Sequence, residues 1–157
     1  MQILYSLRLP PDVESVPLVR HILRSSMEQL GIDPRCVADV ALAVSEACAN
    51  VVAHAGGADH DYEVQVDVDS DACHIRVLDS GDGFDGATFD PAGDLAGDLA
   101  GDLAESGRGV RLMRALVDDL DFMPRSDGER TGTIVHLTKR LFLEPESPLR
   151  TLAADPD

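Results

Sequence analysis

Apolar and polar residues follow the two-residue spacing of a half-buried β-strand at the start of the chain and again in its middle. Residues 2–9 place Ile3, Tyr5, Leu7 and Leu9 on one face before a Pro-Pro stop. A short turn of Asp, Ser and Asp separates two further apolar stretches and predicts a hairpin. Together these patterns predict strands at residues 2–9, 62–68, 73–78, 121–123 and 133–137, the last extending toward Leu141.

Helical spacing of apolar residues marks three other stretches. The first is residues 17–30, followed by Gly31 as a stop signal. Asp33 and Pro34 then form an N-cap and a first helical position, which opens a second helix that runs to about Ala55. The third helical pattern is residues 107–120. The alternation of strands and helices predicts an α/β fold with a sheet covered on one face.

Residues 82–105 differ from the rest of the chain. They carry seven acidic residues and no Lys or Arg, and they repeat Ala-Gly-Asp-Leu three times over positions 92–103. Each glycine costs about 1 kcal/mol relative to alanine in a helix, so we expect a long loop here, which in a compact domain is functional or disordered. The chain from residue 143 to residue 157 contains Pro, Ser and Asp, and we expect a flexible tail.

The charge of the chain excludes several functions. It has 157 residues, a formal net charge of −16 and one lysine, so it repels phosphate backbones and anionic lipids. We therefore expect no direct nucleic-acid binding and no membrane association. Three widely spaced cysteines in apolar surroundings favour reduced thiols, and with them a cytoplasmic location. A hydrophobic content of 44% and this length predict one domain with a substantial core.

The second predicted helix carries the first candidate site residues. Between Val37 and Val52 it is apolar on nearly all sides, yet Glu46, Asn50 and His54 form one stripe at positions i, i+4 and i+8. Burial of an unpaired carboxylate and amide costs several kcal/mol, so the stripe faces a partner, a cleft or a ligand. A stripe that meets solvent along one edge of the helix is an equally good interpretation.

Three glycine-containing motifs follow. Asp79-Ser80-Gly81-Asp82-Gly83 comes directly after a predicted strand, and by itself it is compatible with an ordinary tight turn. Gly107-Arg108-Gly109-Val110 opens the third predicted helix, where free amide groups bind anions; a hinge with solvated arginines is the alternative. Thr131-Gly132-Thr133 begins the last long strand, where a threonine is also an ordinary strand residue.

The order and spacing of these motifs resemble the Bergerat-fold ATPases. Within that superfamily, Glu46-Ala-Cys-Ala-Asn50-Val-Val-Ala-His54-Ala55 is most similar to the anti-sigma factor serine/threonine kinases, and the resemblance covers about residues 3–140. It implies a two-layer α/β sandwich with a mixed, mostly antiparallel sheet of about five strands and about three helices on one face. It also implies a histidine-kinase-like ATP-binding domain over residues 1–142, with an ATP lid at residues 84–106.

The resemblance implies a role for each matching residue. Asn50 would coordinate Mg²⁺, an oxygen-seeking cation, and Glu46 would be the general base toward a protein serine. Asp79 would accept a hydrogen bond from adenine, and Thr133 would support Asp79 and a water at the base. Gly83 would admit the adenine ring, and Gly107, Arg108 and Gly109 would hold the phosphates. Gly81 and Val110 would complete the cofactor-binding set.

The function implied is an ATP-dependent serine kinase that phosphorylates an antagonist protein and sequesters a sigma factor, as a homodimer, with ATP and Mg²⁺ as cofactors. The N-terminal strand and first helix would contact the partner. One alternative is a regulatory module that binds ATP or only protein and has no catalytic activity. Another is a metal-binding domain built on His54, Asp59, His60 and Asp61, although these residues lack the closed ligand set of a structural metal site.

Overall fold

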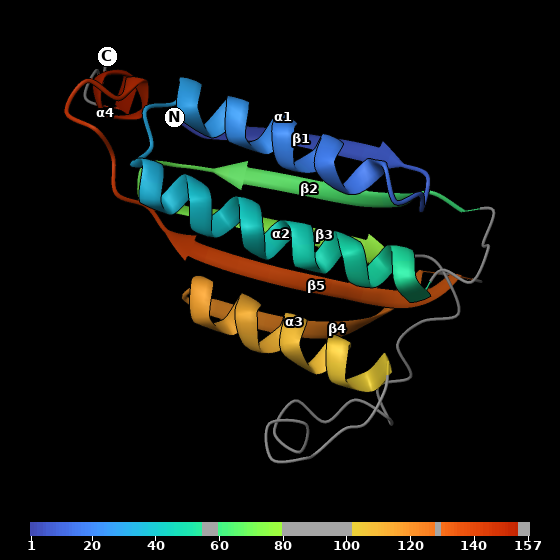
Figure 1. The fold of residues 1–157 in the computed structure, drawn as a ribbon. Coiled ribbons are helices and arrows are strands. Elements are labelled where there is room, and N and C mark those ends of the chain that lie inside the picture. Colours follow the sequence, from blue (N-terminus) through green and yellow to red (C-terminus); the bar gives the residue numbers. More distant parts are fainter. Residues whose placement is uncertain (55–59, 80–101, 128–129, 154–157) are drawn as a thin grey trace.

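In the part of the chain that the structure describes, five strands form one sheet, and three of the helices cover a single face of it (Figure 1). The computed structural model describes residues 1–54, 60–79, 102–127 and 130–153. The elements, in chain order, are β1 (Ile3–Leu9), α1 (Ser15–Gln29), α2 (Pro34–His54), β2 (Tyr62–Val68), β3 (Ala72–Asp79), α3 (Asp102–Leu116), β4 (Asp119–Asp127), β5 (Arg130–Arg140) and α4 (Pro148–Ala153). The predicted two-layer α/β sandwich is therefore confirmed.

The strand order is β1-β2-β3-β5-β4, and each pairing between the described strands is antiparallel. The prediction of a mixed sheet was wrong in this respect. The final strand β5 lies between β3 and β4, so two strands that are distant along the chain become neighbours. This crossover brings residues near position 79 beside residues near position 133, which matters for the site below.

The central helix α2 forms the middle of the core. It contacts α1 on one side and α3 on the other, with the sheet behind it (Figure 1). Its length and composition alone would also suit a membrane-spanning helix, but much of its surface is enclosed by its own fold. Its buried residues are Cys36, Val37, Val40, Ala41, Ala43, Val44, Ser45, Ala47, Cys48 and Val51. The apolar character predicted for this helix therefore reflects burial inside the sandwich.

The predicted hairpin between β2 and β3 is confirmed, with inward residues of β2 alternating as expected. Its turn is closed by Asp69, whose Oδ1 accepts hydrogen bonds from the backbone N–H groups of Asp71 at 2.7 Å and Ala72 at 2.9 Å. These two bonds lower the pKa of the Asp69 carboxyl, because they favour its charged form. The turn is thus fixed by a side chain as well as by the strand ladder.

The third helix begins and ends earlier than its apolar pattern predicts. It begins at Asp102 instead of Gly107 and ends at Leu116 instead of Leu120, because residues from Asp119 onward pair with β5. Gly107 and Gly109 therefore lie inside the helix, and contact with α2 outweighs their low helix propensity. The predicted lid loses its last residues to α3, and its remainder, 84–101, lies outside the described residues.

The segment after residue 142 is not simply a flexible tail. Its backbone pairs with the end of α1: Leu143 bridges Ile32, and the Glu144 N–H donates to Gly31 O at 2.8 Å. The Ser147 hydroxyl donates to Leu30 O at 2.6 Å. The short helix α4 then buries Leu149 completely, at the end of the sandwich that also holds the N-terminus (Figure 1). Because this segment is mostly polar, its sequence alone does not indicate that Leu149 anchors it to the core.

Candidate functional site

The stripe predicted on α2 changes in exposure along its length. Glu46 and Asn50 are half-buried, whereas His54 at the end of the helix is exposed. Ala47 and Val51, on the same turns, are buried. Glu46 and Asn50 therefore lie at the border between the core and a surface that a ligand could occupy.

Helix α3 closes one side of this border through Gly109. A methyl group built on Gly109 would lie 3.0 Å from Glu46 Oε2 and 3.7 Å from both Asn50 Oδ1 and Asn50 Nδ2. The two helices thus approach closely at this point, and a methyl group would crowd the Glu46 carboxylate while making an ordinary contact with the Asn50 amide. The preceding residue, Arg108, is exposed.

This arrangement corrects one expectation about the glycine motif. Gly107 to Val110 lie beyond the first turn of α3, where α-helical geometry pairs each N–H group with the carbonyl four residues earlier. Their amide groups therefore do not form a free helix start, as the sequence had predicted. What the motif provides instead is a close approach to Glu46 and Asn50, with an arginine side chain beside it.

The sheet supplies the other side of the site. Asp79, the last residue of β3, pairs with Thr133 of β5, and Thr133 is buried. A small cavity of about 20 Å³ joins these two residues to Asn50 of α2. A cavity of that volume admits a single water molecule. Asn50, Asp79 and Thr133, which are widely separated in sequence, therefore border one space.

Sequence reasoning missed the apolar walls of this cavity. They come from α2, β3, β4 and β5, and their residues are Ala47, Val51, Val77, Phe122 and Val135. Ala47 and Val51 could have been inferred from their positions next to Glu46 and Asn50 on α2. Phe122 could not, because its place depends on β5 lying between β3 and β4.

The donor set can be compared with the cofactors that the sequence predicts. An amide oxygen is among the ligands that Mg²⁺ takes in proteins, and Asn50 presents one on the turn next to the Glu46 carboxylate. Gly109 keeps the space beside them open. The described residues therefore fit a metal-chelated phosphate group. Gly81 and Gly83, predicted to lie near adenine, fall outside the described residues.

The alternative of a metal site made of histidines and acids gains no support. Within the described ranges, no group of three or more His, Cys, Asp or Glu side chains could hold a metal ion. His54 is exposed at the end of α2, and Asp59 lies outside the described residues.

Comparisons with known proteins agree with this architecture. The profile of the histidine kinase-like ATPase domain matches residues 9–139. The serine-protein kinase RsbW of Bacillus licheniformis is 34% identical over 144 residues, which cover 88% of this chain and 86% of that protein. Serine-protein kinase RsbW of Bacillus subtilis is 32% identical over 142 residues, with 86% and 84% coverage.

Two solved structures share the fold. One contains the RsbU and RsbW domains of a Mycobacterium tuberculosis protein, with a TM-score of 0.61 and 22% identity over 88% of this chain. This chain covers 32% of that longer protein. The other is a SiaB–SiaC complex from Pseudomonas aeruginosa, with a TM-score of 0.61, 16% identity and coverage of 87% and 88%. The profile match and the identities to RsbW show that this chain belongs to the histidine kinase-like ATPase domain family.

Proposed function

We propose that the chain is an ATP-dependent serine-protein kinase that phosphorylates a serine of an antagonist protein and sequesters a sigma factor. Relatives at 32–34% identity over most of their length are named serine-protein kinases. The structural observation that carries the proposal is the close approach of Gly109 to Glu46 and Asn50, since a methyl group built on Gly109 would lie 3.0 Å from Glu46 Oε2. This approach brings the glycine motif of α3 beside the carboxylate and the amide of α2, the groups that such a reaction needs.

When bound, ATP would supply the phosphoryl group and Mg²⁺ would offset its negative charge. Asn50 would hold the metal through its amide oxygen, and the exposed Arg108 on the adjacent helix would meet the phosphates beside Gly107, Gly109 and Val110. Glu46 orients the serine hydroxyl and accepts its proton at a carboxylate oxygen. Catalysis in this arrangement depends on positioning and on electrostatic stabilisation of the transferred group.

Asp79 and Thr133 form the base-recognition side. The strand pairing holds these two residues opposite each other, so an acceptor carboxylate and a hydroxyl have a fixed relation. We propose that Asp79 accepts a hydrogen bond from the exocyclic amine of adenine and that Thr133 supports Asp79 and a water. Gly81 and Gly83 would admit the ring.

Titration of ATP with and without Mg²⁺ tests the binding roles. We expect Asn50→Ala to lose the metal-dependent part of the affinity, and Asp79→Asn to reduce the preference for ATP over GTP. Equal, metal-independent binding by wild type and Asn50→Ala would contradict the assignment of Asn50. Unchanged base preference in Asp79→Asn would contradict the adenine role.

Phosphoserine formation on a candidate antagonist separates the kinase from the non-catalytic alternative. With labelled ATP, wild type should transfer label and Glu46→Gln should bind ATP without transfer. If wild type binds ATP and never labels an antagonist that it captures, the chain is a binding module without kinase activity.

We further propose that the chain works as a cytoplasmic homodimer through the sheet face opposite the helices. That face carries a hollow of about 650 Å³ lined by residues of β1, β2, β3 and β5. Although the chain has a net charge of −16, this face carries charges of both signs. One row of cross-strand neighbours, for example, is Ser6, Gln65, Arg76, His136 and Asp121, which contains one cation and one acid.

A second copy of the chain suits this face better than an acidic partner does. In a twofold dimer the cations of one copy can meet the acids of the other. The sigma factor would instead contact the region of β1 and α1, where Val13 and Leu18 are exposed. Sedimentation of wild type and Arg76→Glu tests the dimer. A monomeric wild type, or an equally stable dimer in the variant, would contradict this arrangement.

A further inference from the structure

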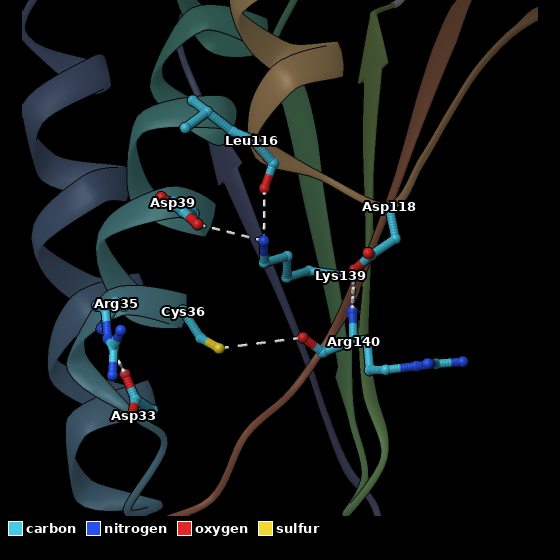
Figure 2. A network of polar contacts seen from close by, with 8 residues as sticks. All are labelled: Asp33, Arg35, Cys36, Asp39, Leu116, Asp118, Lys139 and Arg140. Carbon is cyan, nitrogen blue, oxygen red and sulfur yellow. Dashed lines mark hydrogen bonds and ion pairs between the residues drawn. The ribbon is translucent and has the colours of Figure 1, made fainter.

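One lysine side chain joins three elements at the end of the sandwich away from Gly109. The Lys139 ammonium donates a hydrogen bond to Leu116 O at 2.8 Å and pairs with Asp39 Oδ2 at 3.2 Å (Figure 2). Leu116 is the last residue of α3, Asp39 lies in the second turn of α2, and Lys139 itself belongs to β5. The side chain of Lys139 is only 17% exposed. It is also the one lysine of the whole chain.

A contribution to the stability of the fold does not by itself explain why a lysine occupies this position. An ion pair with a partner as exposed as Asp39, at 39%, contributes about 0–1 kcal/mol. An apolar residue of similar length would fill the same space without desolvating an ammonium group. What an apolar residue cannot do is bond a specific carbonyl at the negative end of a helix. Lys139 therefore fixes where the end of α3 lies.

The proposed ATP-binding residues lie on the same three elements. On each element, their distance along the chain from Asp39, Leu116 or Lys139 places them on the same face. On α2, Asp39 precedes Glu46 by seven residues, or two helical turns. On α3, Gly109 precedes Leu116 by seven residues, and on β5 Thr133 precedes Lys139 by six. Residues at these spacings share one side of a helix or strand. Lys139 and Gly109 thus mark two contact layers between the same helices, about 10 Å apart along the axis.

The end of α3 is held by the following residues as well. The backbone N–H of Arg140, next to Lys139, donates to Asp118 Oδ2 at 2.6 Å in the turn between α3 and β4 (Figure 2). Because helices are stiff, a displacement at the Leu116 end carries through to the Gly109 layer. There the spare room is small, since a methyl group would already meet Glu46 at 3.0 Å.

We propose that Lys139 is a positioning residue for ATP: by bonding the end of α3 to Asp39 of α2, it sets the spacing between Gly109 and the Glu46–Asn50 pair. This inference depends on the proposed function, because the spacing matters only if ATP binds there. Lys139 itself does not touch the nucleotide. Its effect is on the geometry that the nucleotide meets.

Lys139→Met removes the ammonium and keeps the length of the side chain. Mutations that act through such couplings change the coupling energy by about 0.5–2 kcal/mol, so ATP affinity should fall roughly 2- to 30-fold. We expect KM for ATP to rise by a similar factor while kcat changes little. Lys139→Arg, which keeps the charge and several donors, should restore most of the affinity.

Arg35→Met is the matched control. It also removes a cation paired with an aspartate near the start of α2, but Arg35 is 94% exposed and its partner Asp33 lies beside it in sequence. We expect wild-type ATP affinity from this variant. Urea unfolding of each variant reports stability separately from binding.

Asp39→Asn serves if Lys139→Met does not fold, since it weakens one contact and leaves the bond to Leu116 O in place. It should lower ATP affinity in the same direction and by less. Wild-type ATP affinity in folded Lys139→Met or, failing that, in Asp39→Asn would overturn the proposal. So would a loss of stability with KM unchanged, which indicates a merely structural role. Failure of wild type to bind ATP refutes the proposed function instead.

Discussion

Replacement of Leu149 by alanine tests the unexpected anchoring of the C-terminal segment. Leu149 is completely buried, and truncation of a buried leucine to alanine costs about 2–5 kcal/mol. Because α4 has only six residues, it can detach locally, and the free energy of detachment sets an upper limit to the loss. That limit is set by the burial of Leu149, about 2–3 kcal/mol, and by the Ser147–Leu30 hydrogen bond, about 1 kcal/mol.

We therefore expect Leu149→Ala to lower the free energy of unfolding by about 2–4 kcal/mol. Urea unfolding monitored by circular dichroism measures this loss as a lower midpoint. Leu152→Ala is the control, since Leu152 lies on the same helix, is 59% exposed and should change stability by about 0.5 kcal/mol or less. Equal effects from the two substitutions, or a loss below about 1 kcal/mol in Leu149→Ala, would refute the packing of α4.

Three further predictions follow from particular residues. Gly109→Ala should weaken ATP binding with little loss of stability, since a methyl near Glu46 is offset by a gain in helix propensity of up to about 1 kcal/mol; calorimetry and urea unfolding separate the two. Burial raises the pKa of the Cys48 and Cys73 thiols to about 12, so iodoacetamide should label them only after unfolding; rapid labelling of folded protein, seen by mass spectrometry, would argue against this. Burial, and then the charge of Arg76, lower the pKa of His136, so its contribution to stability is present above its unfolded value of about 6.5 and is lost as pH falls below it. His136→Gln should therefore lose less stability than wild type between about pH 7 and pH 5, and equal losses would count against the shift.

Much of the fold follows from local patterns. The alternation of residues 62–68 matches β2 residue for residue, because one face of that strand is fully buried and the other is not. The stop at Gly31 is confirmed, and the residue has the positive φ of 67° that glycine tolerates. The boundaries of α3 could not be read in this way, since they depend on contact with α2 and on pairing of β4 with β5.

In the candidate site, too, some features follow from local sequence patterns and others depend on contacts between distant elements. Its polar residues stand out in the sequence because Glu46 and Asn50 interrupt an apolar helix and Asp79 ends a strand. Their meeting in space depends on the strand order, which no local pattern specifies. The same is true of Phe122 and of Lys139, whose partners lie on elements far away in sequence.

The placement of β5 beside β3 has a consequence for how such a protein can evolve. Asp79 and Thr133 are kept opposite each other by the ladder between those strands, whatever the length of chain that connects them. A tandem repeat such as Ala-Gly-Asp-Leu can therefore grow or shrink by whole copies without altering the register of the pair. The number of copies in this stretch can therefore vary during evolution while Asp79 and Thr133 stay opposite each other.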